Sequence, residues 1–328
     1  MSYFLIFLGI FLLFIVVMDS FTTIFSPRGA GKVTSFWGHF YWSLLLKIHY
    51  KRPIHRVLEV FGPLFTILTV ICWYSLIYLG WFLVFASNED SVIINTTKAN
   101  TTLSEKFYFL GATMATTGYG DTVPSALPWT ALGNFSATGT TLLLTISLSY
   151  VLPVLQAAQK RRVLGQTVFA QGSNVLEFYD SATRSDGDFD QIILNIAKLL
   201  QVHSDNHKIY PVLHFFHNSN KDNSSSIAVL MVTDALFISQ FRKEGLSLSK
   251  TTINSLNNAV KTYIQHKFNT EDHKTDFEED LIKFKCILDK LKYQASPQEL
   301  KARLRKYREV RVPLLSICYN DGWGQEDQ

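Results

Sequence analysis

The hexapeptide TTGYGD at residues 116–121 has the residue types that a cation-binding backbone needs. To strip water from a cation, several successive carbonyl oxygens must point toward one axis, and the required backbone angles are open mainly to glycine, here Gly118 and Gly120. Thr116 adds a hydroxyl oxygen beside the carbonyls, and Asp121 would make the outer mouth of the passage negative. The hexapeptide therefore predicts coordination of a dehydrated cation.

A second group of candidate ligands consists of four histidines in the C-terminal half: His203, His207, His214 and His217. Neutral imidazoles bind zinc-type metals, and histidine titrates nearest physiological pH, so the group could be a metal site or a pH sensor. The first two are four residues apart and would share a helix face. However, YPVL at 210–213 interrupts any single helix between the two pairs. Separate core or surface histidines remain the alternative.

Three apolar segments are long enough to hold TTGYGD within a membrane. A bilayer core takes about 20 apolar residues in a helix, and residues 3–25, 60–86 and 129–155 each meet that length. The first segment lacks a positively charged start and a small-residue cleavage site, so a retained anchor is favoured over a signal peptide. We therefore expect three transmembrane helices.

The distribution of Lys and Arg orients these spans. Six basic residues lie between the first two spans, and Lys160, Arg161 and Arg162 follow the third, which puts both regions on the cytoplasmic side. The basic triplet could also hold anionic membrane lipids. The outer loop then contains Asn95 and Asn100, which begin Asn-x-Thr triplets that could accept glycans.

Residues 33–48 form a further candidate helix with a polar stripe. The polar residues recur every four positions: Ser35, His39, Ser43 and Lys47. This pattern suits a helix that lies in the membrane interface, and the positive-inside bias favours that arrangement over a fourth span. Asp19, in the first span, could pair with the basic loop or extend to the interface, and we expect the latter.

The segment before TTGYGD predicts a re-entrant helix. Residues 103–115 are too short to cross a bilayer, and Thr102 with Glu105 forms the T-x-x-E capping box that begins a helix. Non-helical backbone at membrane depth is tolerated only where it is buried in protein or lines water. TTGYGD is therefore expected to line a passage, with the negative carboxyl end of the helix directed at the ion.

With this arrangement, MATTGYGD at 114–121 resembles the selectivity-filter signature of potassium channels, and the resemblance covers about residues 57–160. It implies that Thr116, Thr117, Gly118, Tyr119 and Gly120 form the ion-binding filter, with the ion ligands being the carbonyls of the first four and the Thr116 hydroxyl. Tyr119 would pack outward against the surroundings of the filter. The permeant ion would be K⁺, with no cofactor.

One residue departs from the pattern of this family, because Thr117 occupies a place usually held by Val or Ile. Its hydroxyl could bond to the re-entrant helix or hold a water, and could weaken selectivity. The chain contains one such signature, and four copies are needed to surround an ion, so a homotetramer is implied. No span carries a basic residue at every third position, so gating by a voltage sensor is not expected.

The third span would be the pore-lining helix. Gly139 lies near the hinge glycine of the family, and Pro153 could bend the cytoplasmic end. A close-packing contact at Gly139 and a simple end of the span at Pro153 are the alternatives. Hydroxyl side chains along this span could face a water-filled cavity or bond to their own helix backbone: Ser136, Thr138, Thr140, Thr141, Thr145, Ser147 and Ser149.

The C-terminal half reads as a soluble, mainly helical domain. Residues 1–156 carry eight Lys/Arg and six Asp/Glu, whereas the rest carry 23 and 21, a mixture too even for a nucleic-acid surface. Helices are expected at 189–200, 250–268, 276–293 and 297–309, a loop at 218–226, and a helix or strand at 227–242. Capping signals occur at Thr275–Glu278 and Ser296–Glu299. Dinucleotide, cyclic-nucleotide and enzyme motifs are not found, and the three cysteines have no metal or disulfide spacing.

The sequence thus predicts an all-α membrane protein with three transmembrane helices, a re-entrant pore helix and selectivity filter, and a mainly helical cytoplasmic domain. The expected domains are an anchor with its loop at 1–56, a pore domain at 57–160 and a regulatory domain at 161–328. The expected function is a non-enzymatic, potassium-selective, homotetrameric channel of the plasma membrane, contacting lipids but no nucleic acid. A weakly selective cation channel, or a membrane-anchored interaction protein with a non-conducting pore, is the alternative.

Overall fold

The computed structural model describes residues 2–26, 30–184, 188–242, 248–265 and 276–324. The chain folds into two compact units: unit 1 comprises 1–38 and 63–153, and unit 2 comprises 39–62 and 154–328. This division differs from the expected domain boundaries, because residues 39–62 pack with the C-terminal half.

Three helices are long and apolar enough to cross a membrane: α1 (Tyr3–Phe25), α3 (His55–Ala86) and α5 (Trp129–Phe169). The three predicted spans are therefore confirmed as apolar helices, although α3 begins earlier and α5 ends later than the apolar segments. Helix α2 (Lys32–His49) is a helix as predicted from residues 33–48, and it is not among the candidate spans.

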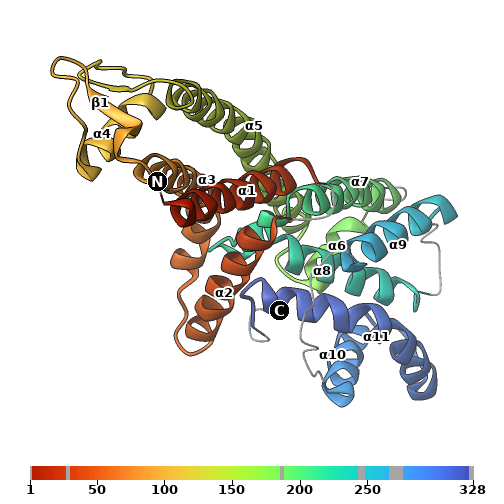
Figure 1. Ribbon diagram of the computed structural model, residues 1–328. Helices are drawn as coiled ribbons and strands as arrows, with labels where there is room; N and C mark the ends of the chain where they lie inside the picture. Colours follow the sequence, from red (N-terminus) through yellow and green to blue (C-terminus); the bar gives the residue numbers. More distant parts are fainter. Residues whose placement is uncertain (1, 27–29, 185–187, 243–247, 266–275, 325–328) are drawn as a thin grey trace. The chain divides into compact units, whose positions relative to one another are not determined.

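In unit 1, α1 and α3 pack closely at two glycines. A Cβ built on Gly9 would lie 2.6 Å from the carbonyl oxygen of Gly80, and one on Gly80 would meet the side chain of Leu13 at 2.9 Å. Small residues allow helix backbones in membranes to approach each other closely, which increases van der Waals contact. Figure 1 shows α1 running alongside α3.

Asp19 is buried inside unit 1 at the start of α2, so the expectation that it reaches the interface is wrong. Its Oδ1 accepts hydrogen bonds from the backbone N–H groups of Val33 (2.9 Å) and Thr34 (3.4 Å). Its Oδ2 accepts from the Thr34 hydroxyl (2.6 Å) and the Trp73 indole (3.0 Å). A carboxylate is stabilised by the N–H groups of a helix amino terminus, and this accounts for the burial of Asp19 among these described residues.

Between α3 and α5, the chain of unit 1 forms η1 (Glu89–Ser91), β1 (Val92–Ile94), α4 (Leu103–Met114) and β2 (Thr122–Pro124). The two strands pair antiparallel and are a small departure from an all-α fold. Helix α4 is held by apolar residues on both sides. Phe109 and Leu110 pack with Phe85 and Trp129, and Met114 packs with Trp73. Figure 1 shows α4 beside β1.

Unit 2 is built around α8 (Ser225–Ser239), which is buried on nearly all sides. The surrounding helices are α6 (Val175–Ala182), α7 (Asp188–Ile209), α9 (Lys250–Gln265), α10 (Phe277–Lys290) and α11 (Pro297–Asn320), with the short turns η2 (Pro211–Phe215) and η3 (Lys221–Asn223). Helix α7 packs on α9, while α6 and α11 pack on α8. The secondary-structure elements among its described residues are all helical, as the sequence predicted.

Two helices of unit 2 extend further than predicted. Helix α7 continues past residue 200 to Ile209, and α11 continues past residue 309 to Asn320, with Pro313 inside it. The Ser296–Glu299 cap is confirmed by a hydrogen bond of 3.1 Å. The ambiguous segment 227–242 is largely helix α8. Thr275 and residues 266–268 lie outside the described residues, and the cap of α10 is Asp276.

A buried ionic network joins α8, α10 and α11 in the core of unit 2. Arg311 Nε lies 3.0 Å from Asp234 Oδ1, and its guanidinium also bonds to Asp280. The Tyr307 hydroxyl donates to Asp234 at 2.7 Å. Burial raises the pKa of Asp280, an effect that the neighbouring Arg311 and Arg308 oppose. Each buried charge therefore has an opposite charge or a hydrogen-bond donor in contact with it, as burial requires.

Candidate functional site

The predicted capping box positions the start of α4. The Thr102 hydroxyl accepts from the N–H of Glu105 (3.3 Å), and Glu105 Oε2 accepts from the N–H of Thr102 (2.7 Å). Two N–H groups that the helix leaves unpaired are satisfied in this way. The helix ends at Met114, as expected from residues 103–115, and TTGYGD follows directly.

The backbone of TTGYGD alternates in handedness. Thr116, Gly118 and Gly120 have positive φ angles of 58°, 57° and 78°, whereas Thr117 and Tyr119 between them do not. In an extended strand successive carbonyls point to opposite sides, but alternation of left-handed and right-handed residues turns them to the same side. Thr116, which has a Cβ, is strained by about 1–2 kcal/mol in this conformation.

N–H groups of this segment bond to carbonyls near the end of α4. The N–H of Thr117 donates to the Ala112 carbonyl at 2.9 Å, and the Thr117 hydroxyl donates to the same oxygen at 2.9 Å. The N–H of Gly118 lies 3.3 Å from it. The Thr117 hydroxyl therefore bonds to the preceding helix, which is the first of the two roles considered for it.

The carbonyls of residues 116–120 differ in whether they accept a hydrogen bond from the chain. Within the described residues, those of 116–119 accept no hydrogen bond from the chain, whereas the Gly120 carbonyl accepts one from Asn95 Nδ2 at 2.9 Å. Gly120, predicted as part of the ion-binding segment, thus has its carbonyl engaged inside the chain. The four preceding carbonyls therefore remain available as hydrogen-bond acceptors or cation ligands within the described chain.

Two tyrosines support the outer end of TTGYGD. The rings of Tyr108 and Tyr119 are stacked, with centroids 6.0 Å apart and planes 8° apart. The Tyr108 hydroxyl interacts with Asp121, the predicted outer-mouth carboxylate. Tyr119 remains 68% exposed in the single chain, which is unusual for a large aromatic side chain next to a packed helix. One face of the segment is therefore held by α4 and the other is open.

The two gating candidates lie on α5. A Cβ built on Gly139 meets no atom within 4 Å in the described chain, so the alternative of a close-packing contact is not seen within one chain. Pro153 does not end the helix, which continues to Phe169. Five hydroxyls on this helix bond to their own helix backbone: Ser136, Thr140, Thr141, Thr145 and Ser149. Of the two roles considered for these hydroxyls, a water-filled cavity or their own helix backbone, these five have the second.

The four predicted histidines are all buried, but they fall into two groups within unit 2. His203 and His207 share a face of α7 with ring centroids 6.0 Å apart, and the His214 ring lies 6.3 Å from that of His207. His217 instead lies with His55, which the sequence pattern did not identify. Among the described residues, no group of three or more His, Cys, Asp or Glu side chains is arranged to hold a metal ion.

His217 is part of a hydrogen-bonded chain of groups. Its Nδ1 lies 2.6 Å from the Asp321 carbonyl, and its Nε2 lies 3.0 Å from His55 Nδ1. A carbonyl only accepts, so Nδ1 of His217 carries the proton and Nε2 accepts from His55. Burial lowers the pKa of His217 to about 4, and the nearby His55 and Arg161 act in the same direction.

Arg161, from the basic triplet after the third span, is buried next to this chain of groups. Its guanidinium lies 2.8 Å from Asp321 Oδ2 and donates to the Leu213 carbonyl (2.8 Å) and the Ser225 hydroxyl (3.0 Å). Arg161 is therefore engaged in the core of unit 2 and does not face lipid. Arg162 is half exposed and lies 3.8 Å from Glu59.

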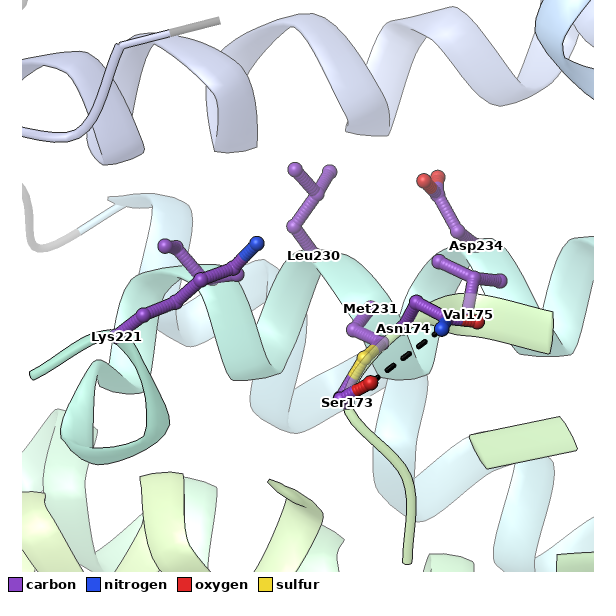
Figure 2. Close-up of a pocket in the computed structure, with 8 residues that line it drawn as sticks. Ser173, Asn174, Val175, Lys221, Leu230, Met231 and Asp234 are labelled. Carbon is purple, nitrogen blue, oxygen red and sulfur yellow. Dashed lines mark hydrogen bonds between the residues drawn. The ribbon is translucent and has the colours of Figure 1, made fainter. Parts of the chain in front are cut away.

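Several hollows are lined by described residues of unit 2. Figure 2 shows one on α8, lined by Lys221, Met231 and Asp234, with a volume of about 20 Å³, which is enough for a single water. A larger one, of about 260 Å³, lies between α10 and α11 and is lined by Leu288, Tyr293 and neighbouring residues. Neither contains a recognisable catalytic constellation.

The exposed surface of the long helices defines the class of protein. Large apolar side chains such as Phe4 (71% exposed) and Phe7 (69%) cover α1, which is typical of a lipid-facing surface. Together with the three apolar helices, this shows a helical membrane protein. The chain is 28% identical over 246 residues to the uncharacterized membrane protein YdjJ of Bacillus subtilis strain 168, across 74% of this chain and 72% of that protein. No protein-family model and no solved structure matches the chain.

Proposed function

We propose that the protein is a potassium-selective channel formed by four copies of this chain. The observation that supports the proposal is the positive φ angle at every second residue, Thr116, Gly118 and Gly120, a backbone pattern that can turn successive carbonyl oxygens to one side of the chain. Such a row can replace the hydration shell of a K⁺ ion. The segment begins at the end of α4, whose negative end favours a cation.

The requirement for four copies follows from the number of ligands. One chain offers one row of carbonyls, and a dehydrated ion must be surrounded on all sides, so identical chains are expected around a symmetry axis. Two features of the single chain suit this arrangement: the exposed ring of Tyr119, and the exposed apolar residues Phe135 and Leu148 of α5. Both would contact neighbouring chains or lipid.

The proposed orientation places unit 2 in the cytoplasm of a cell whose plasma membrane holds the spans. The basic residues between α1 and α3 and after α5 support this side, because Lys and Arg are enriched in cytoplasmic loops. Unit 2 would then be a regulatory part of the channel, and α5 connects it covalently to the residues of unit 1.

Ion flux from liposomes that hold the purified full-length protein tests this function. We expect K⁺ efflux to exceed Na⁺ efflux clearly, and Gly118→Ala to remove the difference or the flux. A Cβ on Gly118 meets no atom within 4 Å in the chain, but its φ of 57° disfavours alanine by about 1–2 kcal/mol. The variant should therefore fold while the row of carbonyls is disturbed.

Gly133→Ala on α5 is the matched control, because a Cβ there makes only ordinary contacts at 3.9 Å and needs no special backbone angle. It should conduct as the wild type does. Equal K⁺ and Na⁺ fluxes through the wild-type protein would leave a weakly selective channel. Absence of flux in a correctly assembled protein would point to an interaction protein with a non-conducting pore.

A further inference from the structure

The outer end of TTGYGD is tied to the chain that precedes α4. Strand β1 pairs with β2 in a register that joins Val92 to Pro124 and Ile94 to Thr122. One residue beyond β1, the N–H of Asn95 donates to the Asp121 carbonyl at 2.8 Å and so extends the ladder. Asp121, at the outer end of the proposed ion pathway, is therefore held by a main-chain hydrogen bond.

The Asn95 side chain continues this connection to Gly120. Its Nδ2 donates to the Gly120 carbonyl at 2.9 Å, and its Oδ1 accepts from Lys98 Nζ at 3.0 Å. An ammonium group can only donate, so Oδ1 must face Lys98 and the NH₂ group must face Gly120. The amide is thus oriented by its two partners, and Lys98 is itself held in a tight turn with a φ of 58° and an N–H bond to the Ile94 carbonyl.

The hydrogen bond from Asn95 restrains the orientation of the Gly120 carbonyl. Gly120 is the last residue of TTGYGD with positive φ, and glycine has little intrinsic resistance to rotation of the following peptide plane. If the Gly120 carbonyl turned toward the row formed by residues 116–119, the outermost ligands would change. The hydrogen bond from Asn95 holds this carbonyl out of the row.

We propose that Asn95 is a positioning residue that fixes the outer end of the ion pathway by holding the Gly120 carbonyl. The outermost ion site is then formed by the Tyr119 carbonyls, with Asp121 behind them at the mouth. This inference rests on the proposed channel function. The ligand concerned is a dehydrated monovalent cation of the size of K⁺.

The test compares conductance at different outer K⁺ concentrations for the full-length protein in planar bilayers. Asn95→Leu keeps the approximate size without adding a charge, but it removes the donor to Gly120. Asn95→Ala removes the side chain beyond Cβ and with it both contacts. We expect each to raise the outer K⁺ concentration at half-maximal conductance by about fivefold, which is the effect of losing one hydrogen bond. The maximal conductance should change little.

Asn100→Ala is the matched control, because Asn100 lies in the same loop and its exposed side chain bonds to Asp90 (2.6 Å) rather than to residues 116–121. It should leave the half-saturating concentration unchanged. Wild-type behaviour of both Asn95 variants, or an equal change in Asn100→Ala, would overturn the inference. So would failure of both Asn95 variants to assemble while Asn100→Ala assembles, because Asn95 would then serve folding. A wild-type protein that does not conduct would instead overturn the proposed function.

Discussion

Acidification should loosen the contact between His217 and the end of α11. His217 is buried with its pKa lowered to about 4, and its ring touches Trp323 with centroids 5.1 Å apart. In the unfolded chain its pKa would be near 6.5. Between these two values the unfolded state binds more protons than the folded state, so stability is fully present above pH 6.5 and decreases as the pH falls toward 4.

The size of this effect follows from the difference in pKa. One pKa unit corresponds to about 1.4 kcal/mol, so the full penalty for protonating folded His217 is about 3 kcal/mol. At pH 5, where the unfolded state is nearly fully protonated at this position, the loss relative to pH 7.5 is about 2 kcal/mol. This corresponds to about a thirtyfold increase in the equilibrium constant for opening.

Hydrogen exchange by mass spectrometry on the full-length protein in detergent measures this opening. The amides of Asp321, Gly322 and Trp323 bond to carbonyls of residues 317–319, so their peptide should lose about thirtyfold protection at pH 5 after correction for intrinsic exchange. The peptide that covers α4 serves as the internal control. His217→Asn keeps a donor near the Asp321 carbonyl but does not titrate, and it should remove most of this pH dependence.

The reasoning would be refuted by either of two results. Protection at residues 317–323 could be equal at pH 7.5 and pH 5 in the wild-type protein, which would mean that His217 is not held neutral by burial. Alternatively, His217→Asn could lose as much protection as the wild type. The pH dependence would then arise from a group other than His217.

Two other substitutions test side-chain polar contacts. Arg161→Met leaves the Asp321 carboxylate buried without its cation and should lower the free energy of unfolding of unit 2 by about 3–5 kcal/mol, whereas Arg162→Met, at a half-exposed pair, should cost less than about 1 kcal/mol in denaturant titrations. Similar losses in both would contradict the burial argument. Thr117→Val should leave the K⁺/Na⁺ permeability ratio unchanged, because the Thr117 hydroxyl bonds to Ala112; a raised ratio would show that it acts on the ion pathway.

Local signals in the sequence predicted those elements that local physics determines. The start of α4 was predictable from Thr102 and Glu105, and the long apolar helices from their length. The segment 227–242 was ambiguous because α8 is buried on nearly all sides and shows no amphipathic period. The extension of α11 was missed because Pro313 normally ends a helix, whereas here Arg311 is fixed in the core by Asp234 and Asp280.

The candidate site was predictable in its sequence but not in its supports. Two glycines two residues apart indicated the left-handed angles at 118 and 120, yet nothing local indicated that Asn95 would bond to Gly120, 25 residues away. Similarly, His55 and His217 are 162 residues apart, and their contact depends on how unit 2 folds. Long-range hydrogen bonds of this kind leave no periodic pattern, so a single sequence cannot identify them.

The last prediction concerns the places where the chain passes from one unit to the other. Three helices cross the division, at Gly38–His39 in α2, Gly62–Pro63 in α3 and Pro153–Val154 in α5. Proline lacks an N–H and clashes with the carbonyl four residues earlier, so a helix bends most readily at a proline such as Pro63 or Pro153.

Pro153→Ala restores that hydrogen bond and should stiffen α5 at the division by up to about 3 kcal/mol. If unit 2 regulates the proposed channel through α5, the variant should change the rate of K⁺ flux but leave the K⁺/Na⁺ ratio unaltered, since residues 116–121 are far away in the sequence. Pro313→Ala is the matched control, because Pro313 also lies inside a helix, yet α11 belongs entirely to unit 2. Equal flux in the wild type and Pro153→Ala, or the same change in Pro313→Ala, would show that bending at Pro153 has no part in gating.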